Sequence, residues 1–269
     1  MGETAATSSA RRKRRPVFRR RPPPPLNRGI ALFLDIDGTL IDLAASPELV
    51  IVDGEVSARL PALARELDGA VALITGRTIA DADTLFPGTA LPTAGQHGAE
   101  RRDARGSIHR HRLPMPGYAE LRRELKRFAA QHDGVHLEDK GATLALHYRQ
   151  APRLASHVHR TLRAQLAIGE GGRAWRLQPG KGILEVQQVG RDKGTAIGEF
   201  MREAPFRGRL PVFLGDDQSD EFGFATVTRL GGWSVKVGPG KTGARYRLAN
   251  VAAVRRWLAG PLLSRVTAK

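Results

Sequence analysis

The first patterned part of the chain reads as a buried strand, an amphipathic helix and a second buried strand. The run "IALFLDID" (30–37) is almost continuously apolar up to Asp35, which is typical of a strand buried in a parallel sheet. Residues 54–69 instead carry apolar side chains at intervals of four, three and four, which predicts a helix closed by a glycine. These side chains are Val56, Leu60, Leu63 and Leu67. The next apolar run, "AVALITG" (70–76), predicts the second strand.

Helices and strands keep alternating on both sides of a differently patterned middle section. Further helices are predicted at 78–86, 192–204, 219–227 and 250–260, strands at 210–217 and 233–238, and a strand end with a loop at 92–98. Asn250 is the expected cap of the last helix. This alternation predicts an α/β fold with a doubly wound, mostly parallel sheet, in which ligands bind beyond the carboxyl ends of the strands.

The middle section has the order α-β-β-α-β-β, which predicts a small sheet with two helices on one face. Its helices are expected at 117–132 and 152–168, and its strands at 135–139, 142–149, 174–180 and 182–189. We therefore expect an α+β domain inserted into the first one. The predicted core covers 29–107 and 189–269, and the predicted insert covers 108–188.

The composition indicates a basic tail and excludes proteins that depend on cysteine. The 269 residues include no cysteine, which excludes disulfides and thiolate metal sites. Residues 1–28 carry nine Lys and Arg against one Glu and are predicted to be a disordered basic tail. The body keeps half of the net charge of +16, which suits an anionic substrate. A nucleic-acid role for the tail is the alternative, although no zinc-finger spacing or aromatic interleaving favours it.

The chain shows no apolar run of the ~18 residues that a membrane span needs, and no signal-peptide core. We therefore expect a cytoplasmic protein without a membrane partner.

Two carboxylates follow the first strand in "DIDGT", at Asp35 and Asp37. A carboxylate such as Asp35 can attack phosphorus, and Asp37 can reach the same space as the acid/base. Such a reaction needs a hard cation, for which Mg²⁺ is suited. An acidic turn is the alternative, which the apolar strand before the pair and "GTL" after it make less favourable.

Three further segments end at the same predicted edge. Thr75 can donate to a phosphate oxygen or simply cap a helix, and Lys193 can hold a phosphate or be a surface lysine. The run "GDDQSDE" (215–221) has four acids, more than a helix start alone explains. Asp216 is the best direct metal ligand there, while Asp217 and Asp220 can bind metal-bound water or hold Lys193. The loop "VGPGKTGA" (237–244) fails as a phosphate loop because Val235 stands where its first glycine is required.

With these motifs in order, the chain resembles the haloacid dehalogenase superfamily and, within it, the trehalose-6-phosphate phosphatase family. The closer likeness rests on "GQHGAE", "LEDKGATLALHYR", "KGILEVQQVGRDKG" and "VGPGKTGARYRL". The resemblance implies a Rossmann-like core with an inserted cap, and a Mg²⁺-dependent phosphatase of trehalose biosynthesis that releases trehalose through an aspartyl-phosphate. It covers about residues 30–258, and only the loop "IDLAASPELVIV" (41–52) matches loosely.

The resemblance also implies the role of each site residue. Asp35 is the expected nucleophile, Asp37 the acid/base, Thr75 and Lys193 the phosphate ligands, and Asp216 completes the metal site with Asp35 and Asp37. The sugar is expected to meet seven further side chains, four from the cap and three from the core. They are Lys140, His147, Lys181 and Glu185, then Arg77, Gln96 and His97.

Two other functions stay open on the sequence. One is a phosphatase or mutase for another sugar phosphate, because only the cap would discriminate the sugar. The other is a catalytically silent subunit that binds nucleic acid through residues 11–21. A small sugar phosphate is the expected partner, and a monomer is the favoured state.

Overall fold

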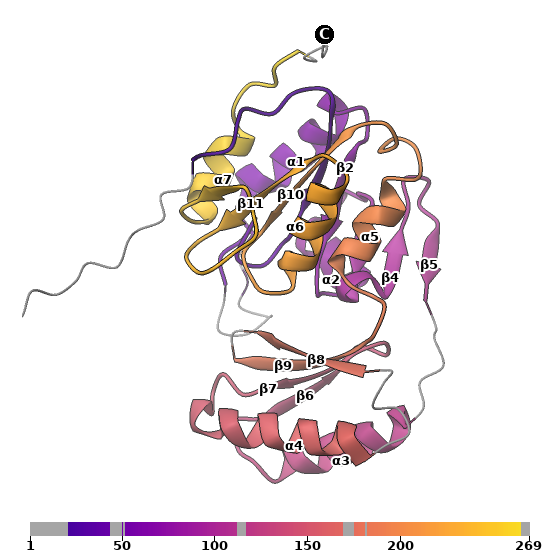
Figure 1. Ribbon diagram of the computed structural model, residues 1–269, viewed down its shortest axis with the longest axis vertical. Helices are drawn as coiled ribbons and strands as arrows, with labels where there is room; N and C mark the ends of the chain where they lie inside the picture. The colour runs from indigo at the N-terminus through magenta and orange to yellow at the C-terminus, as the bar shows by residue number, and fades with distance from the viewer. Residues whose placement is uncertain are drawn as a thin grey trace, which may run out of the picture.

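The computed structural model describes residues 21–43, 50, 52–111, 117–168, 175–180 and 182–264, and these form two sheets stacked end to end (Figure 1). In the larger sheet, six neighbouring strands from β12 to β3 run parallel to one another, while β4 and β5 add an antiparallel edge beside β3. In spatial order its strands are β12 (Tyr246–Leu248), β11 (Trp233–Val237), β10 (Leu210–Gly215), β1 (Ile30–Leu34), β2 (Val71–Ile74), β3 (Thr93–Gly95), β4 (Glu100–Arg102) and β5 (Ile108–Arg110).

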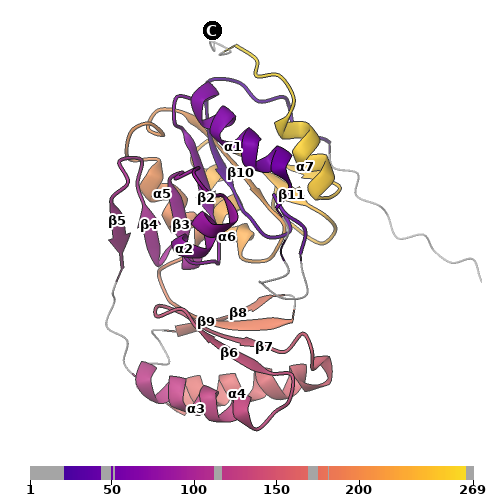
Figure 2. The ribbon, with the colours of Figure 1, turned by 180° about the vertical axis from the view of Figure 1, so that it is seen from behind.

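Helices cover both faces of this sheet, because its central strands are apolar on both sides. Helices α1 (Gly54–Glu66), α2 (Ile79–Leu85) and α7 (Val251–Leu258) lie on one face, and α5 (Lys193–Phe200) and α6 (Asp220–Arg229) on the other (Figures 1 and 2). Neighbouring residues of β1 therefore enter different cores: Leu32 packs under the first group of helices, and Phe33 under the second. The predicted α/β class with a mostly parallel, doubly wound sheet is confirmed.

The position of β1 explains where a ligand can bind. Strand β1 pairs with β2 on one side and with β10 on the other. The chain reaches β2 through α1 on one face of the sheet and reaches β10 after α5 on the other face. Such a switch point opens a crevice beyond the carboxyl ends of the strands. Backbone pairing continues to that end, where the Asp35 amide donates to the Leu214 carbonyl at 3.0 Å.

The second sheet is antiparallel and has the order β6-β7-β9-β8. Its elements are α3 (Tyr118–Ala130), β6 (His136–Asp139), β7 (Leu144–His147), α4 (Ala155–Ile168), β8 (Trp175–Gly180) and β9 (Ile183–Gln188). Apolar side chains on one face, such as Leu146 and Val186, pack against α3 and α4. The opposite face, which carries Glu185 next to His97, is turned toward the larger sheet. The small sheet therefore lies between its own helices and the core (Figures 1 and 2).

Two regions of the chain differ most from the sequence prediction. Strand β5 pairs with β4 in the larger sheet, although the predicted insert begins at residue 108. This hairpin was missed because "ERRDARGSIHR" is polar throughout and has no apolar alternation to mark a strand. The short strand β12 and the 3₁₀ turn η2 (Gln96–Gly98) were also not predicted, and a second 3₁₀ turn, η3 (Pro152–Leu154), replaces the start of the helix predicted over 152–168.

The second difference is at the N-terminus, where residues 21–28 pack on the core instead of remaining a disordered tail. Leu26 is only 2% exposed within the apolar core beside α7. Its carbonyl accepts from the Leu263 amide at 2.8 Å, and the Pro24 carbonyl accepts from Trp257 Nε1 at 3.0 Å. Residues 1–20 lie outside the described part of the chain, as do 44–49 and 51 of the loosely matching loop.

The predicted cap of the last helix is confirmed, since the Asn250 side chain accepts from the Ala253 amide at 2.9 Å. Among the described helices, none combines the length and apolar character needed to cross a membrane.

Candidate active site

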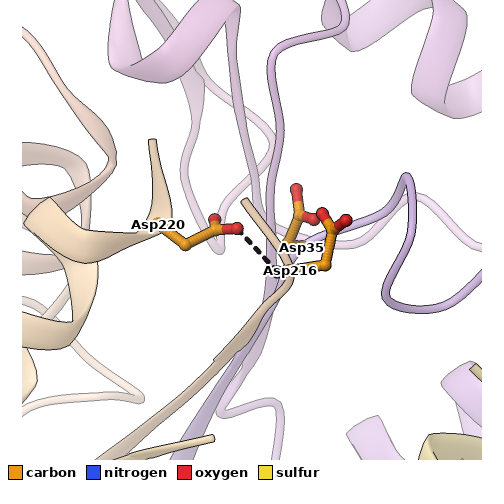
Figure 3. A group of neighbouring side chains, drawn as sticks. All are labelled: Asp35, Asp216 and Asp220. Atoms are coloured by element: carbon orange, nitrogen blue, oxygen red, sulfur yellow. Dashed lines mark hydrogen bonds between the residues drawn. The ribbon is translucent and has the colours of Figure 1, made fainter. Parts of the chain in front are cut away.

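Three aspartates from two neighbouring strand ends converge at the switch point (Figure 3). Asp35 follows β1, Asp216 follows β10, and Asp220 opens α6. Each offers a carboxylate oxygen, and the three oxygens lie within 4.8 Å of one another. The carboxylates of Asp35 and Asp216 lie side by side, whereas that of Asp220 turns back toward the Asp216 backbone (Figure 3). The sequence prediction that strands β1 and β10 bring these acids together is correct.

Lys193 joins this cluster from the first turn of α5. Its Nζ donates to Asp35 Oδ1 at 2.8 Å and to Asp220 Oδ1 at 2.7 Å, and the side chain is 3% exposed. Asp192 caps the helix and so fixes where Lys193 begins it. Burial alone would lower the pKa of Lys193, but Asp220 and Asp35 raise it well above its usual value. The lysine therefore remains a cation held between two acids.

Asp220 is fully occupied by hydrogen bonds. Its Oδ2 accepts from the backbone amides of Asp216 and Asp217 at 2.8 and 2.9 Å, while Oδ1 accepts from Lys193. Burial raises the pKa of Asp220 to about 6, against the opposing effect of Lys193. Asp217 is tied up similarly, because its Oδ1 accepts from the amide and hydroxyl of Ser219 at 2.7 and 2.6 Å. Asp220 and Asp217 thus shape the loop that carries Asp216.

Asp35 is in an environment that penalises its charge. It is 4% exposed, and burial together with Asp220, Asp216 and Asp217 raises its pKa well above the usual value, although Lys193 opposes the shift. Thr39 adds a hydroxyl donor to Oδ2 at 3.0 Å. Four acids facing one lysine leave a local excess of negative charge.

A hard divalent cation fits this donor set, because carboxylate oxygens are its preferred ligands. The backbone also makes room for these oxygens, since a Cβ at Gly38 would lie 2.3 Å from Asp216 Oδ2. Gly38 has φ +79°, a conformation that glycine adopts without strain. An acidic cluster suited to a divalent cation is therefore present among the described residues.

Asp37 and Arg77 form a separate pair across the ends of β1 and β2. Arg77 Nε donates to Asp37 Oδ2 and Nη2 to Oδ1, both at 2.7 Å. The neighbouring Thr75 is 1% exposed, and its hydroxyl accepts from the Arg77 amide at 3.1 Å. Arg77, expected to face the sugar, is thus bound to the predicted acid/base instead.

The small sheet contacts the core at the same end of the molecule. His97 Nε2 and Glu185 Oε2 are 2.6 Å apart, and Lys140 Nζ donates to Glu185 Oε1 and to the Gly76 carbonyl, both at 3.1 Å. A Cβ at Gly76 would lie 2.6 Å from His97 Nε2, so only glycine leaves room for the ring. Burial would raise the pKa of Glu185, but His97 and Lys140 lower it strongly. Glu185 is therefore a buried carboxylate held by His97 from the core and by Lys140 from the inserted domain.

The other predicted sugar-binding residues are placed less uniformly. Gln96 reaches the insert, where its Oε1 accepts from the Ala142 amide at 3.3 Å. His147 lies on β7 and bonds Glu138 Oε2 at 2.8 Å, while Lys140 is 3.4 Å from the same carboxylate. Lys181 lies outside the described residues.

Several residues of the site were missed by sequence reasoning. Glu138 lies two residues before Lys140, so strand alternation from Lys140 would have indicated it. Gln187 lies two residues after Glu185 on the same face and donates to its Oε2 at 2.9 Å. Lys236 lies at the end of β11 and donates to the Asp216 carbonyl, a role for which an isolated lysine in an apolar strand is the only signal.

The doubly wound core, the acidic strand ends and the inserted sheet together define a phosphatase of the haloacid dehalogenase superfamily. The family model described as trehalose-phosphatase matches residues 33–253. The chain belongs to the trehalose-phosphatase family and is accordingly a phosphoric monoester hydrolase.

Individual relatives agree with this assignment. The chain is 45% identical over 233 residues to the trehalose-6-phosphate phosphatase of Escherichia coli (strain K12), covering 87% of this chain and 86% of that protein. It is 43% identical over 209 residues to a probable trehalose-phosphate phosphatase of Sinorhizobium fredii, covering 78% of each. The C-terminal domain of trehalose-6-phosphate phosphatase from C. albicans has the same fold, with a TM-score of 0.76, 22% identity and coverage of 88% and 96%.

Proposed function

We propose that this protein hydrolyses trehalose 6-phosphate to trehalose and phosphate, in trehalose biosynthesis, with Mg²⁺ and through an aspartyl-phosphate on Asp35. The observation that carries the proposal is the buried Asp35, which lies 2.8 Å from Lys193 Nζ and beside Asp216. The names of the bacterial relatives supply the sugar.

In the first step, a carboxylate oxygen of Asp35 attacks the phosphorus, and the bond from phosphorus to the sugar oxygen breaks. The sugar leaves with a proton that Asp37 gives to its oxygen. Lys193 and Thr75 hold the phosphoryl oxygens, and Lys193 also keeps Asp35 in place. The product of this step is trehalose and a phosphorylated Asp35.

In the second step, a water attacks the phosphorus of phosphorylated Asp35 and gives its proton to Asp37. The bond from phosphorus to the Asp35 oxygen breaks, which releases phosphate and restores the Asp35 carboxylate and the protonated Asp37. Asp37 therefore acts as acid and then as base, and Arg77 holds it at the correct place between the two steps.

The cation would be held by Asp35 and Asp216, with Asp37 contributing from the same loop. When bound, it offsets the negative charge of the phosphate and of the acids around it. Asp220 and Asp217 hold the loop that carries Asp216 and do not bind the cation directly.

The inserted domain acts as a cap that selects the sugar. Lys140 and Glu185 lie at the contact with the core and are the principal partners for sugar hydroxyls, with His147 and Lys181 as further cap residues. Gln96 and His97 line the core side. In the structure Glu185 bonds His97 directly, so a sugar that enters must replace part of this contact.

The deciding experiment is phosphate release from a panel of sugar phosphates, with and without Mg²⁺. We expect trehalose 6-phosphate to be hydrolysed fastest and only with the metal. A sucrose or mannose phosphate preferred over trehalose 6-phosphate would leave the phosphatase chemistry intact and reject the proposed substrate. Activity retained in Asp35→Asn would reject the aspartyl-phosphate.

A further inference from the structure

Arg176 bridges the cap and the core at a point away from the acidic cluster. It lies on β8, one strand from Glu185, and its Nη2 donates to the Arg191 carbonyl at 2.7 Å. Its Nη1 is 3.7 Å from Asp192 Oδ2, and its guanidinium carbon lies 4.5 Å from the centre of the Phe222 ring. One cap side chain therefore contacts two separate parts of the core.

Both of those parts lead directly to the catalytic cluster. Asp192 caps α5, whose first residue is Lys193. Phe222 is the third residue of α6, whose first residue is Asp220. Arg176 thus touches the starts of the two helices that supply the buried Lys193–Asp220 ion pair.

Arg176 also continues into the sugar-facing side of the cap. Its Nη2 and Nε are 3.2 and 3.4 Å from Gln187 Oε1. The amide nitrogen of Gln187 then donates to Glu185 Oε2, which is 2.6 Å from His97 Nε2. A continuous row of contacts thus runs from the Phe222 ring to Arg176 and then, through hydrogen bonds, to Gln187 and Glu185.

We propose that Arg176 is a positioning residue that sets the cap against the core, so that Glu185 meets the sugar while Lys193 holds the phosphate. This inference rests on the proposed function only in needing a sugar phosphate as substrate. Arginine suits the task because its planar guanidinium can stack on an aromatic ring and donate in several directions at once. A lysine would keep the charge but lose the stacked, divergent geometry.

The test compares a sugar phosphate with an ester that has no sugar, using the full chain. Steady-state rates are measured for trehalose 6-phosphate and for p-nitrophenyl phosphate in the wild type, Arg176→Met, Arg176→Lys and Phe222→Leu. We expect kcat/KM for trehalose 6-phosphate to fall about 10- to 100-fold in Arg176→Met, since misplacing a substrate-holding group by ~1 Å can cost 10²-fold. The rate with p-nitrophenyl phosphate should stay within about twofold, because Lys193 keeps its bonds to Asp35 and Asp220 and that ester needs no cap contacts.

Arg176→Lys and Phe222→Leu should show smaller losses with the same selectivity for the sugar phosphate. The matched control is Arg160→Met on α4, an exposed arginine on the far side of the cap, which should change neither rate. If the wild type prefers another sugar phosphate, the proposed substrate fails, and the same comparison is made with the preferred sugar.

Two results would overturn the role of Arg176. One is an equal loss on both esters in properly folded Arg176→Lys and Phe222→Leu, as judged by their thermal midpoints. The other is an unchanged kcat/KM for the sugar phosphate in Arg176→Met. Should Arg176→Met fail to fold, Phe222→Leu decides alone, because its ring meets the same guanidinium from the core side.

Discussion

Arg77 holds Asp37 by two parallel hydrogen bonds, Nε to Oδ2 and Nη2 to Oδ1, each 2.7 Å long. The pair joins the ends of β1 and β2, so the residue proposed to move the proton is fixed to the strand beside its own. Both oxygens of Asp37 are occupied, which means that one bond to Arg77 must open when the carboxylate meets the sugar oxygen or water. Arg77 thereby acts on the reaction through Asp37.

Replacing Arg77 should therefore lower turnover rather than substrate binding. We expect Arg77→Lys to reduce kcat with trehalose 6-phosphate by about 10- to 100-fold, because lysine keeps the charge but cannot make two parallel bonds. Steady-state kinetics separate the two roles: a raised KM with an unchanged kcat would assign Arg77 to sugar binding, as the resemblance implies.

Asp35→Asn should abolish turnover and at the same time make the metal-free protein more stable. Loss of the nucleophile should reduce phosphate release by at least about 10³-fold. The raised pKa of Asp35 shows that burial and three neighbouring acids disfavour its charge, so a neutral amide removes an unfavourable interaction. The gain should appear as a higher thermal midpoint of the metal-free variant. Lys193 still has Asp220 as a partner, and a lower midpoint in the variant would contradict the argument.

Metal dependence should separate Asp216 from its neighbour Asp217. Chelation with EDTA should stop phosphate release, and added Mg²⁺ should restore it. Asp216→Asn should raise the Mg²⁺ concentration for half-maximal activity by at least about 10-fold. Even the loss of a group that only hydrogen-bonds a metal ligand lowers metal affinity or activity by about 10–100-fold. Asp217→Asn should have a smaller effect, because the carboxylate of Asp217 is bound to Ser219. Equal requirements in both variants would place the metal elsewhere.

The sequence predicted the catalytic end of the core better than it predicted the surfaces that meet there. The proximity of Asp35 and Asp216 could be predicted because parallel strands present their carboxyl ends at one edge of the sheet. The sequence left Asp217 and Asp220 either to bind metal-bound water or to hold Lys193, and in the structure Asp220 accepts from Lys193. The hydrogen bonds from Arg77 to Asp37 and the stacking of Arg176 on the Phe222 ring could not be predicted, since they depend on side-chain direction and on how the two sheets face each other. A polar residue in "WRLQPG" indicates an exposed strand face, but not which partner that face meets.

Leu26 should contribute measurably to stability, although the sequence assigned it to a disordered tail. Its side chain is buried under α7 and 2% exposed, so Leu26→Ala should destabilise the fold by about 2–5 kcal/mol. At ~2–4 °C per kcal/mol, the thermal midpoint should fall by at least about 4 °C. The neighbouring Pro25 is exposed, and Pro25→Ala serves as the control with little expected change. Equal midpoints for Leu26→Ala and the wild type would show that this packing is not maintained in solution.

His111 should make the stability of the core sensitive to mild acid. The residue follows β5, and its Nδ1 lies 2.6 Å from Arg191 Nη2, which donates to it only while the ring nitrogen is unprotonated. Glu199 Oε2 lies 3.5 Å from the other ring nitrogen and 3.3 Å from Arg101 Nε, so arginines face the ring from two elements and one carboxylate opposes them. Burial first, and then Arg191, lower the pKa of His111, while Glu199 acts in the opposite direction.

The sign of the pH effect follows from this lowered pKa. Between the folded value and the ordinary value of about 6.5, the unfolded chain binds the proton more tightly, so the free energy of unfolding falls as the pH falls. We expect the thermal midpoint of the wild type to decrease from pH 7 to pH 5.5 more steeply than that of His111→Gln, which has no proton to gain. His136→Gln, at an exposed position on β6, should keep the slope of the wild type. Parallel curves for the wild type and His111→Gln would mean that the bond to Arg191 carries no proton-linked stability.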